Sequence, residues 1–393
     1  MNNSTVLNNV LATQSYLTDK IIGDKVRQIW YVVLKCAMYD LFATTGIVAN
    51  VINLSVFWEM GCHDSAGVTL ISLTLSDLVS LLILFWMGMC YNPLFTYSDV
   101  SFDTQSVVYL SGGWLKIYIS RVTSWITAFL SLERCLCIAM PLRVRRALTK
   151  SRSVYINAGI FVVIFCMLPP IYSTTWLDWQ WFPDRNRTLL GLDFSSDRDH
   201  VYDTVAFVNV VLTYVSFFII LACTLILVAT LNKQLQWRNA TSKKLSSASS
   251  KELRVNKMIV LIALLFISFF FPGTVVLLVM VFVPEFNKGM FYNNLFTVVW
   301  AFIHIMEAWN SSFNIFVYYN MSSKFRSILN YKFRCLRRSF DKTVTDKLDQ
   351  CNYDSTTFNK ETPRIPCIYS IIPKEFLLST TPIVNEVIPE SKS

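Results

Sequence analysis

The clearest indication of the fold is the stretch LERCLCIAMPL at residues 132–142. In it, the carboxylate of Glu133 and the guanidinium of Arg134 follow a long apolar segment and precede a basic loop. Charged side chains at the edge of a bilayer are costly to desolvate, so they are kept there when they have a function. The pair therefore predicts the point at which a membrane helix emerges from the bilayer.

The composition of the whole chain agrees with a membrane protein. Of its 393 residues, 53% are hydrophobic and 16% are charged, whereas soluble domains carry about 25% charged residues. The net charge of +9 is spread over short segments between apolar runs, which excludes a soluble nucleic-acid-binding protein. The first 28 residues lack the basic start and compact apolar core of a cleavable signal peptide. We therefore expect the first apolar segment to act as the membrane signal.

Seven segments contain the roughly 20 predominantly apolar residues that a membrane helix needs. They are Trp30–Trp58, Ala66–Cys90, Val107–Met140, Val154–Leu177, Thr204–Leu231, Met258–Val283 and Met290–Tyr319. We predict an all-α fold, a bundle of seven transmembrane helices followed by a short amphipathic eighth helix. The predicted regions are an extracellular N-terminus at 1–29, the helical domain at 30–335 and a disordered cytoplasmic tail at 336–393.

The charges of the loops predict the orientation in the bilayer. Residues 143–152, after the third segment, carry five basic residues, and residues 233–257, after the fifth, carry seven against the single acid Glu252. The loop at 178–203 has six aspartates against three arginines. The positive-inside rule therefore places the N-terminus outside and the C-terminus inside. Three glycosylation sequons then face outward, at Asn2, Asn3 and Asn186.

The chain after the seventh segment predicts attachment to the inner membrane surface. Ser322–Phe333 has the pattern of a short amphipathic helix with Phe325, Ile328 and Leu329 on one side. Cys335 follows directly and is a candidate for palmitoylation. The tail beyond it is polar, with scattered Ser and Thr, and is typical of a disordered segment open to phosphorylation.

Polar residues within the apolar segments carry a family resemblance. They are Asn50 in the first segment, Asp77 in the second, Glu133-Arg134-Cys135 in the third, Pro272 in the sixth and Asn310, Asn314 and Tyr318 in the seventh. This set resembles the rhodopsin-like (class A) family of G protein-coupled receptors over roughly Trp30 to Cys335. The resemblance implies an extracellular ligand, a heterotrimeric G protein as partner, arrestin and a kinase at the tail, and no enzymatic activity.

Several stretches are also similar to the chemosensory receptors of gastropod molluscs. They are 91–95 (YNPLF), 121–129 (RVTSWITAF), 186–192 (NRTLLGL) and 314–320 (NIFVYYN). This similarity implies a plasma-membrane protein that detects an external chemical cue.

The resemblance implies an activation switch at the inner end of the helices. Arg134 keeps its charge under all conditions and offers a fork of donors to a carboxylate. Glu133 is its neighbour, and Glu252 stands where the family places an acid that holds the same arginine in the resting state. The alternative is that Glu252 is a solvated loop acid. Pro272 kinks the sixth helix, and Tyr318 ends the motif of the seventh.

A second polar cluster is expected in the middle of the bilayer. In the family, a carboxylate at the position of Asp77 binds a sodium ion, and Thr123, Asn310 and Asn314 supply further oxygen atoms. The alternative is a protonated Asp77 that is hydrogen-bonded to Asn314 without sodium.

Charged residues in the outer half of the third and seventh segments predict the ligand site. Lys116 and Arg121 face His304 and Glu307, with Ser120 between the two cations. Two cations and one anion favour a ligand with an anionic group, and the alternative is an internal salt bridge of Glu307. Phe270, where the family more often has tryptophan, completes the predicted site. The seventh segment lacks a lysine for a retinal Schiff base, so the chain is not an opsin.

The outer end departs from the family pattern. Tyr109 occupies the position of the usual cysteine in the third helix, and residues 178–203 contain no cysteine, so we assign no disulfide. We expect Trp176, Trp179, Trp181 and Phe182 to order this loop as an aromatic lid. The acidic loop leaves a neuropeptide receptor as an alternative. A transporter is more remote, because the halves of the chain do not repeat each other.

Overall fold

The computed structural model describes residues 23–61, 64–140, 146, 148–241, 247–335 and 337–338, without the side chains of residues 237–252. The chain divides into two units, Met1–Arg326 and Ser327–Ser393. The predictions for Asn2 and Asn3, for the side chain of Glu252 and for the tail beyond residue 338 lie outside the described residues.

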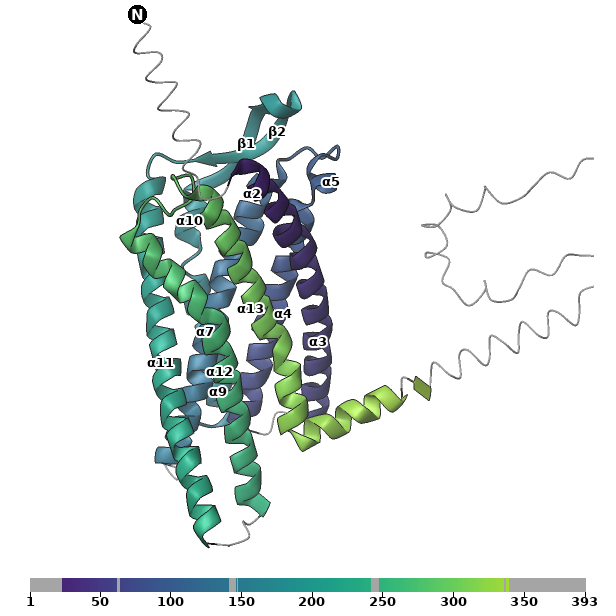
Figure 1. The fold of residues 1–393 in the computed structure, drawn as a ribbon, viewed down its shortest axis with the longest axis vertical. Coiled ribbons are helices and arrows are strands. Elements are labelled where there is room, and N and C mark those ends of the chain that lie inside the picture. Colours follow the sequence, from purple (N-terminus) through teal and green to yellow (C-terminus); the bar gives the residue numbers. More distant parts are fainter. Residues whose placement is uncertain are drawn as a thin grey trace, which may run out of the picture. The chain divides into compact units, whose positions relative to one another are not determined.

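The first unit is built from long helices. The first segment is a continuous run of α2 (Asp24–Trp30), η1 (Tyr31–Met38) and α3 (Tyr39–Met60), and the second is α4 (Ser65–Tyr91). The short helix α5 (Pro93–Thr96) follows α4. The third segment is the run of α6 (Thr104–Val108), η2 (Tyr109–Gly113) and α7 (Trp114–Ala139). The other four are α9 (Lys150–Phe165) with α10 (Pro169–Ser173), then α11 (Arg198–Thr241), α12 (Ser247–Phe282) and α13 (Asn293–Met321). In the described residues these seven segments form the predicted bundle, which is confirmed (Figure 1).

Local sequence explains where several helices begin. The side chain of Asp64 accepts a hydrogen bond from Gly67 N at 3.1 Å, and that of Thr149 accepts one from Arg152 N at 3.4 Å. Both are N-caps that satisfy an otherwise unpaired amide of the first turn. Pro272 lies inside α12, and the helix continues past it to Phe282.

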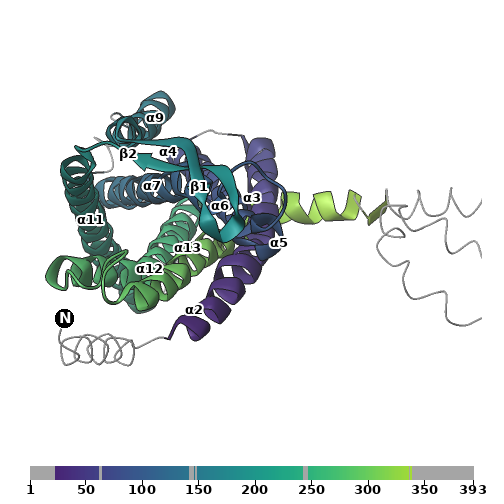
Figure 2. The ribbon, with the colours of Figure 1, turned by 90° about the horizontal axis from the view of Figure 1, so that it is seen from above.

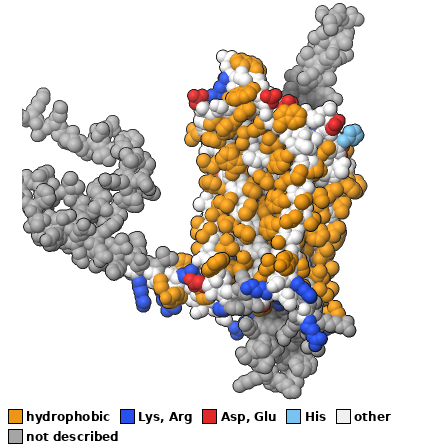
Figure 3. All heavy atoms as spheres, turned by 180° about the vertical axis from the view of Figure 1, so that it is seen from behind, with side chains coloured by type: hydrophobic (Ala, Val, Ile, Leu, Met, Phe, Trp, Pro, Cys, Tyr) orange, Lys and Arg blue, Asp and Glu red, His pale blue; other side chains and the backbone are white. Residues whose placement is uncertain are grey.

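The surface of the bundle is that of a protein solvated by lipid. Six of the helical runs are long and apolar enough to cross a membrane, judged on the described residues. The remaining segment, α13, spans 29 residues but carries Glu307, Asn310 and Asn314. Figure 3 shows an apolar band around the middle of the helices on one face. Large apolar side chains such as Phe207, Phe218 and Phe282 are exposed on the helices, as expected where hydrocarbon replaces water.

The core lies between the helices. At its outer end, Leu34 and Tyr39 of the first run pack with Leu84 of α4 and Val298 of α13. Further in, Phe266 and Phe270 of α12 pack against Phe217 of α11 and Ala128 of α7. Helix α7 therefore lies among α4, α11 and α12, which places its polar residues at the centre of the bundle (Figure 2).

A β-hairpin lies across the end of the bundle at which α2 and α11 begin (Figures 1 and 2). Its strands are β1 (Thr175–Phe182) and β2 (Arg187–Phe194), joined by η3 (Pro183–Arg185) and paired antiparallel from Thr175↔Phe194 to Phe182↔Arg187. The predicted fourth segment, Val154–Leu177, is therefore wrong at its end. Pro169 and Pro170 lack the amide donors that would continue α9, so the chain turns through α10 and enters β1.

The predicted aromatic lid is also wrong. Trp176, Trp179 and Trp181 on β1 are exposed by 42%, 59% and 58%. Phe182 instead packs across the hairpin over Gly191, where an added Cβ would lie 2.9 Å from the ring. The ladder between the strands, not a packed cover of tryptophan, orders this loop.

Residues 323–335 form a helix, in agreement with the predicted amphipathic segment at Ser322–Phe333. Cys335, the candidate for palmitoylation, is an exposed free thiol.

Candidate functional site

The inner end of α7 holds the charged pair that the sequence singled out. Arg134 Nη2 donates to Glu133 Oε1 at 2.6 Å, and Glu133 is 1% exposed. Glu133 Oε2 and Arg134 Nε have no hydrogen-bond partner among the described residues. Each charge therefore keeps free capacity for another partner, and the pair is a self-contained contact that a competing group can replace.

Tyr318 closes α13 near the same end of the bundle. Its ring contacts Phe57 of α3 at a centroid distance of 5.0 Å and Phe325 at 5.7 Å, and it is 1% exposed. The hydroxyl has no hydrogen-bond partner in the described part of the chain. The ring contacts therefore pack Tyr318 against α3.

Asp77 lies at the centre of the mid-bilayer cluster. Its two oxygens accept from Ser311 Oγ at 2.8 Å and from Asn314 Nδ2 at 2.8 Å, and it is fully buried. Asn50 of α3 joins the cluster by donating to the carbonyl of Ser311 at 3.1 Å. The cluster therefore ties α3, α4 and α13 together.

The predicted sodium ligands are brought together only in part. Thr123 donates to Ser76 at 3.0 Å, and no hydrogen bond joins Thr123 or Asn310 to Asp77 in the residues described. Asn314 Oδ1, however, is buried and accepts no hydrogen bond from any described group. Oxygen atoms of these kinds suit a hard cation, so sodium stays a prediction, and the direct Asn314–Asp77 hydrogen bond is that of the alternative. Asp77, Ser311 and Asn314 would hold the ion, which would neutralise the buried charge.

The outer half of α7 contains a buried ion pair. Lys116 Nζ donates to Glu307 Oε2 at 2.7 Å and to Ser80 Oγ at 2.8 Å, and Lys116 is 1% exposed. Ser120 also donates to Glu307 Oε2, at 2.9 Å, and His304 Nδ1 lies 3.5 Å from it. The structure thus brings four of the predicted ligand-site residues together, in the internal salt bridge that was the alternative to ligand contact.

Arg121 and Phe270 lie apart from this ion pair. The guanidinium of Arg121 donates to Thr213 of α11, and its Nε has no described partner although the residue is 6% exposed. Phe270 stacks on Phe266 with centroids 4.0 Å apart. Arg121 is therefore a buried cation that contacts no carboxylate of the described residues, and Phe270 is packed in the core between α7 and α11.

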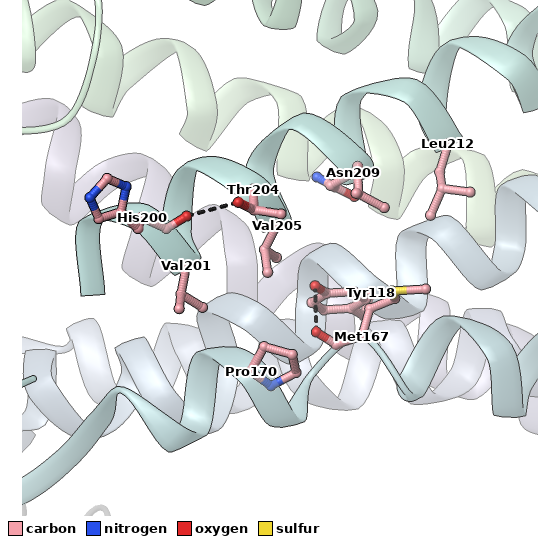
Figure 4. A pocket seen from close by; sticks show the side chains of 10 residues that line it. Tyr118, Met167, Pro170, His200, Val201, Thr204, Val205, Asn209 and Leu212 are labelled. Atoms are coloured by element: carbon pink, nitrogen blue, oxygen red, sulfur yellow. Dashed lines mark hydrogen bonds between the residues drawn. The ribbon is translucent and has the colours of Figure 1, made fainter. Parts of the chain in front are cut away.

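A cavity of about 380 Å³ opens between α7, α10 and α11 (Figure 4). Its walls are mostly apolar and contain none of the predicted ligand residues: Tyr118, Met167, Pro170, His200, Val201, Thr204, Val205, Val208, Asn209 and Leu212. Asn209 Oδ1 is the buried oxygen of this wall that lacks a described hydrogen-bond partner. Patterns of charge in the sequence could not indicate this cavity, because it is formed by small gaps between apolar faces.

The outer loops are joined by hydrogen bonds and ion pairs in place of a disulfide. Leu190 of β2 exchanges backbone hydrogen bonds with Ser101 and Asp103, at 3.0 and 2.9 Å. Two ion pairs flank this contact, Arg187 to Asp99 at 2.7 Å and Arg185 to Asp103 at 3.4 Å. All described cysteines are free thiols.

Tyr109 also connects the outer elements. Its hydroxyl accepts from Arg198 Nη2 at 3.0 Å, and its ring makes an edge contact with Phe194 at 6.4 Å. The ammonium of Lys288 lies 4.6 Å from the centre of the same ring. Tyr109, in place of cysteine, thus joins α11, the hairpin and the loop before α13.

Sequence reasoning missed several hydrogen-bonding partners in the core. Ser80 is three residues after Asp77 and Ser311 three before Asn314, so each lies one turn from a predicted residue on the same helix. Thr213 and Ser216 of α11 meet Arg121 and Ser124 across the bundle. The first two could have been found from helical spacing, whereas the last two depend on the packing of α11 against α7.

The fold and the site define an integral membrane receptor of the seven-helix type. The model of the protein family described as "7 transmembrane receptor (rhodopsin family)" matches residues 49–318 of this chain. The chain therefore belongs to the rhodopsin family of G protein-coupled receptors, whose members are signalling receptors with an extracellular ligand and a G protein partner. It is also similar to the lysophosphatidic acid receptor 4 of Homo sapiens, with 22% identity over 320 residues, 79% of this chain and 80% of the relative.

Proposed function

We propose that this chain is a chemosensory receptor of the plasma membrane. An external chemical cue binds among the outer halves of its helices, with the N-terminus outside, and the inner end then catalyses nucleotide exchange on a heterotrimeric G protein. The observation that supports this most is the buried Glu133–Arg134 pair at the inner end of α7. It lies on the same helix as Lys116, whose partner Glu307 belongs to α13, near the outer end.

Helix α7 carries Lys116 near one end and Glu133 and Arg134 near the other, so it gives a physical route between the two ends of the bundle. Lys116 and Arg121 each have few hydrogen-bond partners. A ligand that competes for one of these cations would therefore shift the equilibrium between positions of α7. Release of Arg134 from Glu133 would then expose a cation to the G protein. A receptor kinase would phosphorylate Ser and Thr of the tail, and arrestin would then bind the phosphorylated tail.

The experiment is a screen of amino acids, organic acids, short peptides and lipids on cells that express the chain, with nucleotide exchange as the readout. A cue that activates the wild type should fail on Arg134→Ala, while surface expression is unchanged. Normal signalling by Arg134→Ala would overturn the switch assignment. Lys116→Ala and Arg121→Ala should weaken an anionic cue, and unchanged potency in both would remove these residues from the ligand site.

A lipid is the second candidate for the cue. Two observations favour it: the similarity to a receptor named for lysophosphatidic acid, and the apolar cavity between α7, α10 and α11, which would accept a hydrocarbon chain. Replacement of Val205 by Trp should fill this cavity. The variant should lose the response to a lipid cue and retain the response to a water-soluble one.

A further inference from the structure

Basic side chains from three elements gather at the outer end of the bundle. Lys35 belongs to η1, Arg198 begins α11, and Lys288 lies in the loop between α12 and α13. Lys288 and Arg198 meet at Tyr109: the ammonium lies 4.6 Å from the centre of its ring, and Arg198 Nη2 donates to its hydroxyl at 3.0 Å. Lys35 interacts electrostatically with Lys288. A fourth cation, Arg27 of α2, lies within range of Lys35. The cluster therefore spans the end of the bundle from the first helix to α11.

The two lysines rest on aromatic rings rather than on acids. Lys35 Nζ lies 4.6 Å from the centre of the Tyr91 ring and 5.0 Å from that of Tyr31. Lys288 Nζ lies 4.6 Å from the centre of the Tyr109 ring. In the described part of the chain neither ammonium donates to a protein acceptor or pairs with a carboxylate. Aromatic faces stabilise a cation but accept few of its N–H donors, so those donors remain free for a ligand.

Acids near the cluster compensate it poorly. Arg198 lies over Phe194 at 4.0 Å, and its carboxylate contact, Asp199 at 3.7 Å, is fully exposed and weak. Asp103, on the same side of the bundle, is paired with Arg185. The deeper Lys116 differs, because Glu307 neutralises it at 2.7 Å. Like charges held together without a counter-charge repel, and a bound anion relieves that repulsion.

We propose that Lys35, Lys288 and Arg198 form a binding site for the phosphate-monoester group of an extracellular ligand. Three cations suit a group that carries about −1.5 to −2 charge at neutral pH and several acceptor oxygens better than a singly charged carboxylate. Such a site identifies the cue as a phosphate monoester, and this inference rests on the proposed function. It lies outward of the Lys116–Glu307 pair, so the phosphate group binds at the entrance and the remainder of the ligand extends inward.

The test uses the full-length receptor, purified in phosphatidylcholine nanodiscs, with inorganic phosphate as the probe. Thermal unfolding is followed as phosphate replaces chloride at constant ionic strength. The Tm of the wild type should rise and reach a plateau. Lys35→Gln and Lys288→Gln should each raise the half-saturating phosphate concentration about tenfold, the loss expected for one charged hydrogen bond. Lys35→Arg should retain the response, and Lys25→Gln, which changes an exposed lysine of α2, is the matched control.

A second arm distinguishes the source of the phosphate group. Nanodiscs that contain phosphatidic acid should stabilise the wild type without added phosphate if the group belongs to a membrane lipid, and glycerol phosphate should do so if the ligand is soluble. Either result supports the site when Lys35→Gln and Lys288→Gln weaken it. Equal unfolding temperatures in phosphate, lipid phosphate and chloride would overturn the proposal, as would a response that survives in the double variant. Arg134→Ala should keep the phosphate response, so loss of signalling and loss of the anion site are separate results.

Discussion

Lys116 and Glu307 show how a single buried pair combines stability and function. Both are almost inaccessible, and Ser80 and Ser120 complete their hydrogen bonding. Desolvation of two charges offsets much of their attraction, so such a pair contributes little net stability, whereas the removal of one partner leaves an uncompensated charge. The pair is therefore better suited to a switch than to a fixed support.

Substitution of one partner tests this view. Glu307→Gln should destabilise the purified receptor by about 3–5 kcal/mol, because Lys116 is left buried without a counter-charge. The double variant Lys116→Met/Glu307→Met should recover most of the loss, since similar volumes are filled without charge. Thermal unfolding in nanodiscs measures both, and a single variant as stable as the wild type would show that water reaches the pair.

Asp77 provides a second test at the level of residues. If sodium binds beside Asp77 and Asn314, the Tm should be higher in sodium chloride than in choline chloride at equal ionic strength, by the mass action of a ligand on the folded state. Asp77→Asn should abolish the difference. The same Tm in both salts for the wild type would favour the alternative of a protonated, directly hydrogen-bonded Asp77.

At the scale of elements, the hairpin β1–β2 is held by contacts that salt and charge can alter. Its backbone pairing to Ser101 and Asp103 lies between the Arg185–Asp103 and Arg187–Asp99 pairs. A family disulfide would fix this contact covalently. In this chain the contact between the hairpin and residues 101–103 depends on ion pairs at a solvated surface, which salt screens. The entrance to the bundle is therefore easier to open than it would be with a disulfide.

Hydrogen exchange should reveal that difference. Arg185→Gln/Arg187→Gln should accelerate exchange of the amides of Asp103 and Leu190 severalfold, because exposed ion pairs contribute about 0.2–1 kcal/mol each. Added reductant should leave the exchange unchanged. The charge-swapped pair Asp99→Arg/Arg187→Asp should restore slower exchange relative to Arg187→Asp alone, and an equal rate in the two would show that the Arg187–Asp99 pair does not hold the hairpin.

At the scale of the whole molecule, the sequence predicted the helices well because twenty-residue apolar segments have few alternative structures in lipid. The spacing of Asp77, Asn314 and Glu133-Arg134 indicated residues that the structure places in buried polar clusters. The hairpin was not predicted, because its contacts with Ser101 and Asp103 join segments far apart in the sequence. The outer cation cluster was missed because Lys35 and Lys288 meet only once the bundle has formed.

The central claim is that the Glu133–Arg134 pair restrains a receptor that activates G proteins. The most direct measurement is nucleotide exchange on purified heterotrimeric G proteins by the receptor in nanodiscs, without any ligand. Glu133→Gln weakens a charged hydrogen bond of about 1.5–3 kcal/mol and should raise the exchange rate about tenfold above the wild type. Addition of Arg134→Ala should return it to background. A folded Glu133→Gln receptor that leaves exchange at the wild-type level on every G protein would contradict the account.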